Sequence, residues 1–335
     1  MALTLRTLFV LVLAASFLFG GLWLDYRRFL QTPMPIGDAS AVLEVQPGAG
    51  LRQVAADLKA RGVLKHPYYL LALAYQRGDQ SRIKAGEFEL TPGMRPGDLL
   101  DRLISGKTIQ YPITLVEGWT FRQAVEAIAA DPRFGGDLAG KTDAELMSAL
   151  GLPGEHPEGW IFPDTYSFPR RTTGMDVLRR AHERMQQILA QEWDGREEGL
   201  PLETPYQALI LASIIEKETA VPAERPAIAG VFVRRLQKGM RLQTDPTVIY
   251  GMGDRYDGNI RRADLQEATP YNTYVIDGLP PTPIALAGRE AIHAALHPAP
   301  GDSLYFVARG DGSHAFSANL EDHNAAVRKY QLGKP

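Results

Sequence analysis

The residues best suited to chemistry lie in one short run, ASIIEKET at positions 212–219, where a lysine separates two glutamates. On a helix of 3.6 residues per turn, Glu216 and Glu218 point about 160° away from one another. Glu218 shares its side of that helix with three apolar residues, Leu211, Ile214 and Ile215. Burial against apolar neighbours disfavours the charged carboxylate and raises its pKa, as a general acid requires near neutral pH. Glu218 is therefore the predicted acid/base group.

A strong helix start precedes this run. Thr204 occupies the N-cap position, Pro205 the first helical position and Gln207 the capping-box position. An alternative interpretation ends the helix at Lys217 and leaves both glutamates in solvent, because charges are common at helix ends. Periodicity alone does not decide between these two interpretations.

Polar and aromatic residues gather in the stretch that follows, within LQTDPTVIYG at 242–251, YNTY at 271–274 and GLPPTPI at 278–284. Aromatic faces suit the apolar side of a sugar ring, and amide and hydroxyl groups suit its hydroxyl edges. Residues 242–283 are also rich in Pro and Gly, which predicts a loop-rich binding surface. Each motif alone is weak evidence, because Tyr and Asn in turns are often structural.

His293 and His297 are a candidate metal site, because their spacing of four residues is that of zinc ligands on one helical face. No acidic third ligand stands out nearby, and the H-E-x-x-H motif is absent. We therefore expect no metal and no cofactor, with His297 ending a helix before Pro298. A P-loop and a G-x-S-x-G motif are absent as well.

The elements that would position these residues read as a mixed α+β body. Apolar residues at helical spacing predict further helices near 175–193 and 226–237. Earlier in the chain, residues 41–107 read as a compact module in the order strand, helix, helix, strand, followed by a third helix.

The first residues predict a membrane anchor. Residues 8–24 carry no charge and approach the ~20 residues that span a bilayer. Trp23 and Tyr26 lie where an interfacial aromatic belt is found. A cleaved signal peptide is the competing interpretation, but Gly20 and Gly21 continue directly into another apolar stretch. We expect an anchor with its flanks at 1–30 and a linker at 31–40.

Composition excludes several classes of function. The formal net charge of -3 and the lack of a basic run give no reason to expect nucleic acid as a ligand. The chain has no cysteine, which removes disulfides, thiol catalysis and lipidation on Cys.

The motifs together resemble the endolytic murein transglycosylase family, also called the MltG or YceG-like proteins. The runs that carry the resemblance are LVEG at 115–118, EGW at 158–160, FPDTY at 162–166, ASIIEKET at 212–219, RLQTDPTVIYG at 241–251, YNTY at 271–274, GLPP at 278–281 and HP at 297–298. The resemblance covers nearly the whole chain, from the anchor to Asn324.

The resemblance implies a lyase anchored in the bacterial inner membrane by one helix, with a periplasmic body made of a LysM-like module at 41–107 and a catalytic domain at 108–335. It implies cleavage of the β-1,4 bond between N-acetylmuramic acid and N-acetylglucosamine within peptidoglycan strands, leaving a 1,6-anhydro end. The family's catalytic glutamate maps onto Glu218. The implied substrate-binding residues are Gln243, Asp245, Thr247, Tyr250, Asn272 and Tyr274. Peptidoglycan synthases and penicillin-binding proteins are the implied partners.

Two alternatives stay open at this point. A hydrolase would need a second carboxylate near the bond, for which Asp245, Asp164 and Glu117 are candidates. A lytic transglycosylase needs one acid/base group only, because the 6-hydroxyl of the sugar is the nucleophile. A glycan-binding scaffold without chemistry, which positions cell-wall synthases, is the other rival.

Overall fold

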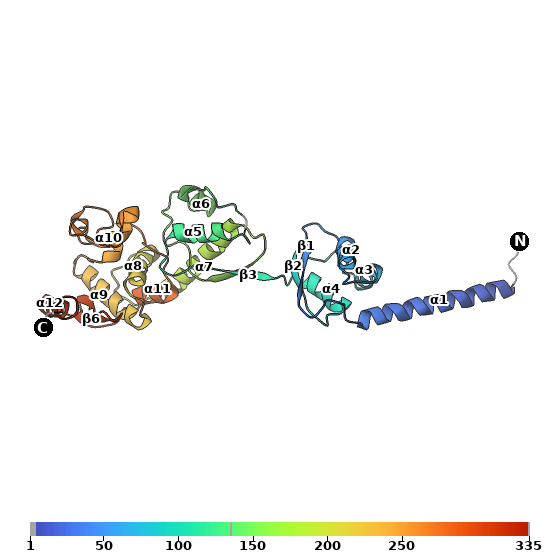
Figure 1. The fold of residues 1–335 in the computed structure, drawn as a ribbon. Helices are drawn as coiled ribbons and strands as arrows, with labels where there is room; N and C mark the ends of the chain where they lie inside the picture. The colour runs from blue at the N-terminus through green and yellow to red at the C-terminus, as the bar shows by residue number, and fades with distance from the viewer. Residues whose placement is uncertain (1–4, 135, 334–335) are drawn as a thin grey trace. The chain divides into compact units, whose positions relative to one another are not determined.

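The computed structural model describes residues 5–134 and 136–333. It divides into two compact units, Met1–Tyr111 and Pro112–Pro335 (Figure 1). Helices and small two-stranded sheets make up both units, so the expected α+β class is confirmed.

The first unit begins with α1 (Leu5–Gln31), a helix long and apolar enough to cross a membrane. The helix continues past the predicted span because its last two turns pack on the module that follows. The hydroxyl of Tyr26 donates to Gln76 Oε1 at 2.7 Å, and the hydroxyl of Tyr69 donates to Asp25 Oδ2 at 2.9 Å. The segment expected as a linker is packed as well, since Met34 is buried and its N–H donates to the Met94 carbonyl at 2.8 Å.

The rest of this unit is the predicted order of strand, two helices, strand and helix. Its elements are β1 (Ala41–Val45), α2 (Leu51–Ala60), α3 (Pro67–Arg77), β2 (Gly86–Leu90) and α4 (Pro96–Ser105). The two strands pair antiparallel with Leu43 opposite Phe88, and both side chains are fully buried. Alternation along these strands therefore builds the small core against the three helices.

The second unit opens with a strand pair and three helices that share one hydrophobic core. These elements are β3 (Gln110–Thr114), α5 (Phe121–Ala130), α6 (Asp143–Ala149), β4 (Thr165–Pro169) and α7 (Gly174–Asp194). Strand β3 pairs with β4. Capping by Thr120, Thr142 and Thr173 starts the three helices.

A second core surrounds α8 (Pro205–Glu218), which packs against helices from four other parts of the unit (Figure 1). These are α7, α9 (Arg225–Gln237), α10 (Asp245–Met252) and α11 (Arg289–Leu296). Helix α10 lies inside the stretch predicted as loop. Asp245 and Pro246 form its first turn, where proline is favoured. The high proline content of the stretch had instead indicated a loop.

The unit ends with the hairpin of β5 (Tyr305–Ala308) and β6 (His314–Ser317), followed by α12 (Leu320–Tyr330). Three short 3₁₀ turns complete the described elements, η1 (Pro222–Glu224), η2 (Gly253–Arg255) and η3 (Asp264–Gln266).

Candidate active site

Glu218 is the last residue of α8. The helix starts as predicted, because the Thr204 hydroxyl accepts the N–H of Gln207 at 3.2 Å and Pro205 follows the cap. Every side chain from Ala208 to Ile215 is buried. The carboxyl group of Glu218 thus lies at the end of a helix whose middle is buried and mostly apolar.

The hydroxyl of Thr244 donates a hydrogen bond to Oε1 of Glu218. Burial raises the pKa of Glu218 to about 7, the Thr244 hydrogen bond lowers it, and the charge of Asp245 raises it. A carboxyl group with this pKa exists in both protonation states near neutral pH, so it can donate a proton and later accept one.

Two further threonines, Thr247 and Thr273, hold Thr244 in place. The N–H of Thr244 donates to Thr273 Oγ1 at 3.0 Å, and the carbonyl of Thr244 accepts the Thr247 hydroxyl at 2.9 Å. Thr247 and Thr273 also share a hydrogen bond of 2.9 Å between their hydroxyl oxygens. All three are buried, so the group that touches Glu218 has little freedom to move.

The turn before Thr244 is held by the guanidinium of Arg235. Its Nη1 donates to the carbonyls of Arg241 at 2.9 Å and Leu242 at 3.0 Å, and to Gln243 Oε1 at 3.2 Å. Gln243 has a φ of 52°, in the left-handed region that residues other than glycine seldom adopt. Such a conformation persists where its surroundings determine it, and here it directs Thr244 and Asp245 toward Glu218.

A cleft of about 500 Å³ opens over Glu218. One wall contains Arg235, Gln243, Thr244, Asp245 and Tyr274, and the other comes from β5, β6 and α12. The Tyr274 hydroxyl donates to Asp245 Oδ1 at 2.6 Å. Burial, with the hydrogen bond to Asp245, raises the pKa of Tyr274, so the phenol stays a neutral donor to a charged carboxylate.

The predicted substrate-binding residues separate into three groups. Gln243, Asp245 and Tyr274 line the same cleft as Glu218. Thr247 and Asn272 are buried, and their hydrogen bonds hold the backbone near Thr244 and Tyr274. The amide of Asn272 donates to the carbonyls of Asp264 and Glu267, at 3.0 and 2.7 Å, and its oxygen accepts the N–H of Tyr274.

Tyr250 faces a different cleft, of about 750 Å³, which also contains Thr120, Lys217 and Glu158. Glu158 is 4% exposed and accepts the N–H of Phe121 with both oxygens, at 3.1 and 3.0 Å. Burial raises the pKa of Glu158 to about 7, although hydrogen bonds from Phe121 and Tyr250 lower it. The second unit therefore carries a buried glutamate, Glu158, and a partly buried one, Glu218, in separate clefts, and burial raises the pKa of each to about 7.

Comparison with known proteins shows the family of this chain. The model of the YceG-like family matches residues 43–329 of this chain. The chain belongs to the YceG-like family. It is 31% identical, over 94% of its length and 91% of the relative's, to a protein of Bacillus subtilis named endolytic murein transglycosylase. A Streptococcus pneumoniae protein of the same name is 27% identical, and there the match covers 97% of this chain but 64% of the relative. The crystal structure of a yceG-like protein from Listeria monocytogenes has 30% identity and a TM-score of 0.55, covering 86% of this chain and 99% of that one.

Glu216 of this YceG-like chain lies apart from the cleft of Glu218. Its Oε1 pairs with Arg225 Nη2 at 2.8 Å, and its Oε2 accepts the N–H of Gly288 at 2.9 Å. The Glu216 side chain is 5% exposed and that of Arg225 is 8% exposed. The interpretation that left both glutamates in solvent is therefore wrong, because Glu216 is part of a buried ion pair.

The three candidates for a second carboxylate are also separated. Asp245 lies in the cleft of Glu218. Glu117 lies 3.7 Å from Arg225, on the side of Glu216, and Asp164 accepts the N–H of Thr165 at 2.7 Å. Neither of these two lines the cleft, so Asp245 is the acidic neighbour of Glu218 there.

Two residues important to this YceG-like site escaped the sequence analysis. Thr244 lies within the motif at 241–251, but its role depends on a partner 26 positions away. Arg235 lies on α9 in an ordinary helical pattern, and its hydrogen bonds to the turn before Thr244 are tertiary contacts. A pattern of residue types contains no signal for either contact.

Proposed function

We propose that this chain is an endolytic transglycosylase that cleaves the β-1,4 bond between N-acetylmuramic acid and N-acetylglucosamine within peptidoglycan strands. The observation that carries the proposal is Glu218, a partly buried carboxyl group with a pKa of about 7 that faces a polar cleft. The name of the Bacillus subtilis relative supports the same reaction and substrate.

Glu218 acts first as an acid and then as a base. Its proton passes to the glycosidic oxygen while the bond from that oxygen to C1 of the muramic residue breaks. The 6-hydroxyl of the same residue then bonds to C1, and its proton passes to the Glu218 carboxylate. The product ends in a 1,6-anhydro ring, no water is consumed, and Glu218 is protonated again.

Asp245 and Thr244 assist from the walls of the cleft. Glycosidic cleavage passes through a transition state with positive charge at C1, which a nearby carboxylate stabilises. Asp245 supplies that carboxylate, and the Tyr274 hydroxyl holds it in place by a hydrogen bond. Thr244 stabilises the ionised form of Glu218 after proton transfer. Gln243 and Tyr274 offer polar groups to the sugar hydroxyls.

The main rival is a hydrolase, which the presence of Asp245 in the same cleft favours. An Asp245 carboxylate that activates water would give a reducing end in place of an anhydro ring. The two products differ by the mass of one water molecule, so mass spectrometry separates them.

The remaining parts of the proposal concern location. Helix α1 is proposed to span the inner membrane once, with the module at 41–107 and the second unit in the periplasm near peptidoglycan synthases such as penicillin-binding proteins. The module at 41–107 is proposed to act as a LysM-like unit that adds affinity for glycan. A reporter fused after Pro335 should be active in its periplasmic form, and a cytoplasmic signal would contradict this topology.

The reaction is tested with the full chain in detergent and purified sacculi. Glu218→Gln keeps the shape of the side chain but removes the transferable proton, so release of soluble fragments should fall by about 10²–10⁴-fold. Glu183→Gln, an exposed glutamate on α7, is the control and should match the unaltered protein. Fragments with 1,6-anhydro ends support the proposal, reducing ends support the hydrolase, and binding without release supports the scaffold.

A further inference from the structure

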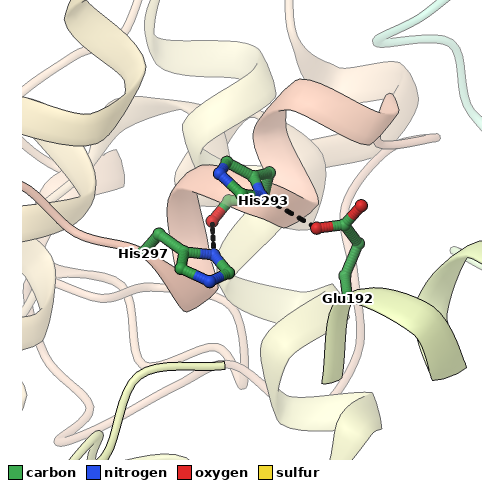
Figure 2. A group of neighbouring side chains, drawn as sticks. All are labelled: Glu192, His293 and His297. Carbon is green, nitrogen blue, oxygen red and sulfur yellow. Dashed lines mark hydrogen bonds and ion pairs between the residues drawn. The ribbon is translucent and has the colours of Figure 1, made fainter. Parts of the chain in front are cut away.

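Two histidines and a glutamate meet on the second unit, away from both clefts. Glu192 lies near the end of α7, and His293 and His297 lie at the end of α11 (Figure 2). Each offers one ligand atom, and these atoms all lie within 4.8 Å of one another. The sequence near the two histidines offered no acidic third ligand. In the structure this ligand is Glu192, which lies 101 positions before His293 in the chain.

The contacts of His297 leave one ring nitrogen poorly satisfied. Its Nδ1 lies 3.1 Å from the His293 carbonyl, and its Nε2 lies 2.9 Å from the Gly195 carbonyl. A neutral imidazole has a single N–H, so it cannot donate to both oxygens. The His293 ring lies against the His297 ring, with their centroids 4.1 Å apart. A cation would accept the lone pair of the His297 ring nitrogen that carries no proton.

The surrounding backbone favours positive charge. Helix α7 ends at Asp194 and α11 ends at Leu296, so both helices direct their negative C-terminal ends toward the cluster. Glu192 adds a carboxylate that is 10% exposed, and its Oε2 lies 2.8 Å from His293 Nδ1. Arg289 Nε holds the other oxygen at 2.7 Å, as outer groups commonly orient a ligating carboxylate.

We propose that Glu192, His293 and His297 bind one divalent transition-metal ion, with Zn²⁺ as the best match to two imidazoles and one carboxylate. The ion would join the end of α7 to the end of α11. Helix α11 packs along α8, which carries Glu218, so the metal would brace the helix layer behind the cleft. This role is one of stability and does not depend on the proposed reaction.

The test uses the full chain in detergent, purified without a polyhistidine tag and treated with chelator. Titration with ZnCl₂, followed by calorimetry, should show one site. A hundredfold excess of Zn²⁺ over its dissociation constant should raise the unfolding midpoint by about 5 °C or more. His293→Gln, His297→Gln and Glu192→Gln should each weaken binding at least tenfold. His66→Gln, an exposed histidine of the first unit, is the matched control and should bind as the unaltered protein does.

Two results would overturn the proposal. One is that the unaltered chain shows no saturable Zn²⁺ binding and no rise in midpoint. The other is that His293→Gln and His297→Gln bind as tightly as the His66→Gln control. The His293 side chain is 57% exposed, so its replacement is tolerated by the fold even if that of Glu192 is not. Binding and midpoint are read without any glycan, which keeps this outcome separate from that of the catalytic proposal.

Discussion

The hydroxyl of Thr244 donates to the carboxylate of Glu218, and this contact joins the last residue of α8 to the residue before α10. The donor is itself fixed by Thr273, whose hydroxyl accepts the Thr244 N–H at 3.0 Å. A buried network that leads to one carboxylate sets both its orientation and its proton affinity. The pH dependence of activity is therefore the most direct measure of this relationship.

Thr244→Val should move the pH profile upward. The substitution keeps the shape of the side chain but removes a hydrogen bond that lowers the pKa of Glu218. That pKa then rises, and so does the pH at which the acid form is lost. The check is the rate of fragment release from sacculi between pH 5 and 9, with Thr165→Val, an exposed threonine on β4, as control. An unchanged profile would show that the Thr244 contact does not tune Glu218.

Asp245→Asn should move the same profile in the opposite direction. The charge of Asp245 raises the pKa of Glu218, so its removal lowers that pKa, while the amide can still accept the Tyr274 hydroxyl. The rate should fall because the positive charge at C1 loses its stabilising partner. The product should keep its anhydro end. Loss of reducing ends on substitution would instead identify Asp245 as the base of a hydrolase.

Glu216→Gln should reduce stability more than it reduces chemistry. The change removes the most buried of the carboxylates around Arg225, which keeps Glu290 and the more distant Glu117 as partners, so the free energy of unfolding should fall by less than the roughly 3 kcal/mol that an isolated buried pair would lose. Urea unfolding measures the loss, and activity per folded molecule should stay far above that of Glu218→Gln. Inactive but fully stable Glu216→Gln protein, together with active Glu218→Gln protein, would reverse the assignment of the two glutamates.

The sequence predicted the burial that raises the pKa of Glu218, but not the hydroxyl group that the carboxyl group meets. Thr204 and Pro205 start α8, and the helix then reaches Glu218 as expected. The helical wheel assumed one apolar face, but α8 is buried on all sides, so Glu216 is as enclosed as Glu218. What separates them is the partner that each meets, a hydroxyl for one and a guanidinium for the other.

The contacts that the sequence did not predict are all between residues far apart in the chain. The β1–β2 module was predicted in full because alternation and helical spacing are local signals. Glu158 lay in a quoted motif, but its burial depends on the start of α5, 37 positions earlier. The cluster of Glu192 with His293 joins residues 101 positions apart. Such contacts arise from the packing of helices, and one sequence without its fold does not contain them.

The two buried glutamates should also make stability depend on pH. Burial raises the pKa values of Glu158 and Glu218 from 4.5 to about 7 in the folded chain. A carboxyl group that is easier to protonate when folded stabilises the fold below its unfolded pKa, and this contribution is lost as pH rises through the folded pKa.

Glu158→Gln removes one such group. The unfolding midpoint of the variant minus that of the unaltered chain should therefore be higher at pH 8 than at pH 4.5, because position 158 no longer holds a buried carboxyl group that has to ionise at pH 8. Calorimetry at these two values, with Glu183→Gln as the exposed control, measures the difference. A midpoint difference from the unaltered chain that is the same at both pH values would show that Glu158 titrates as an ordinary surface carboxyl group.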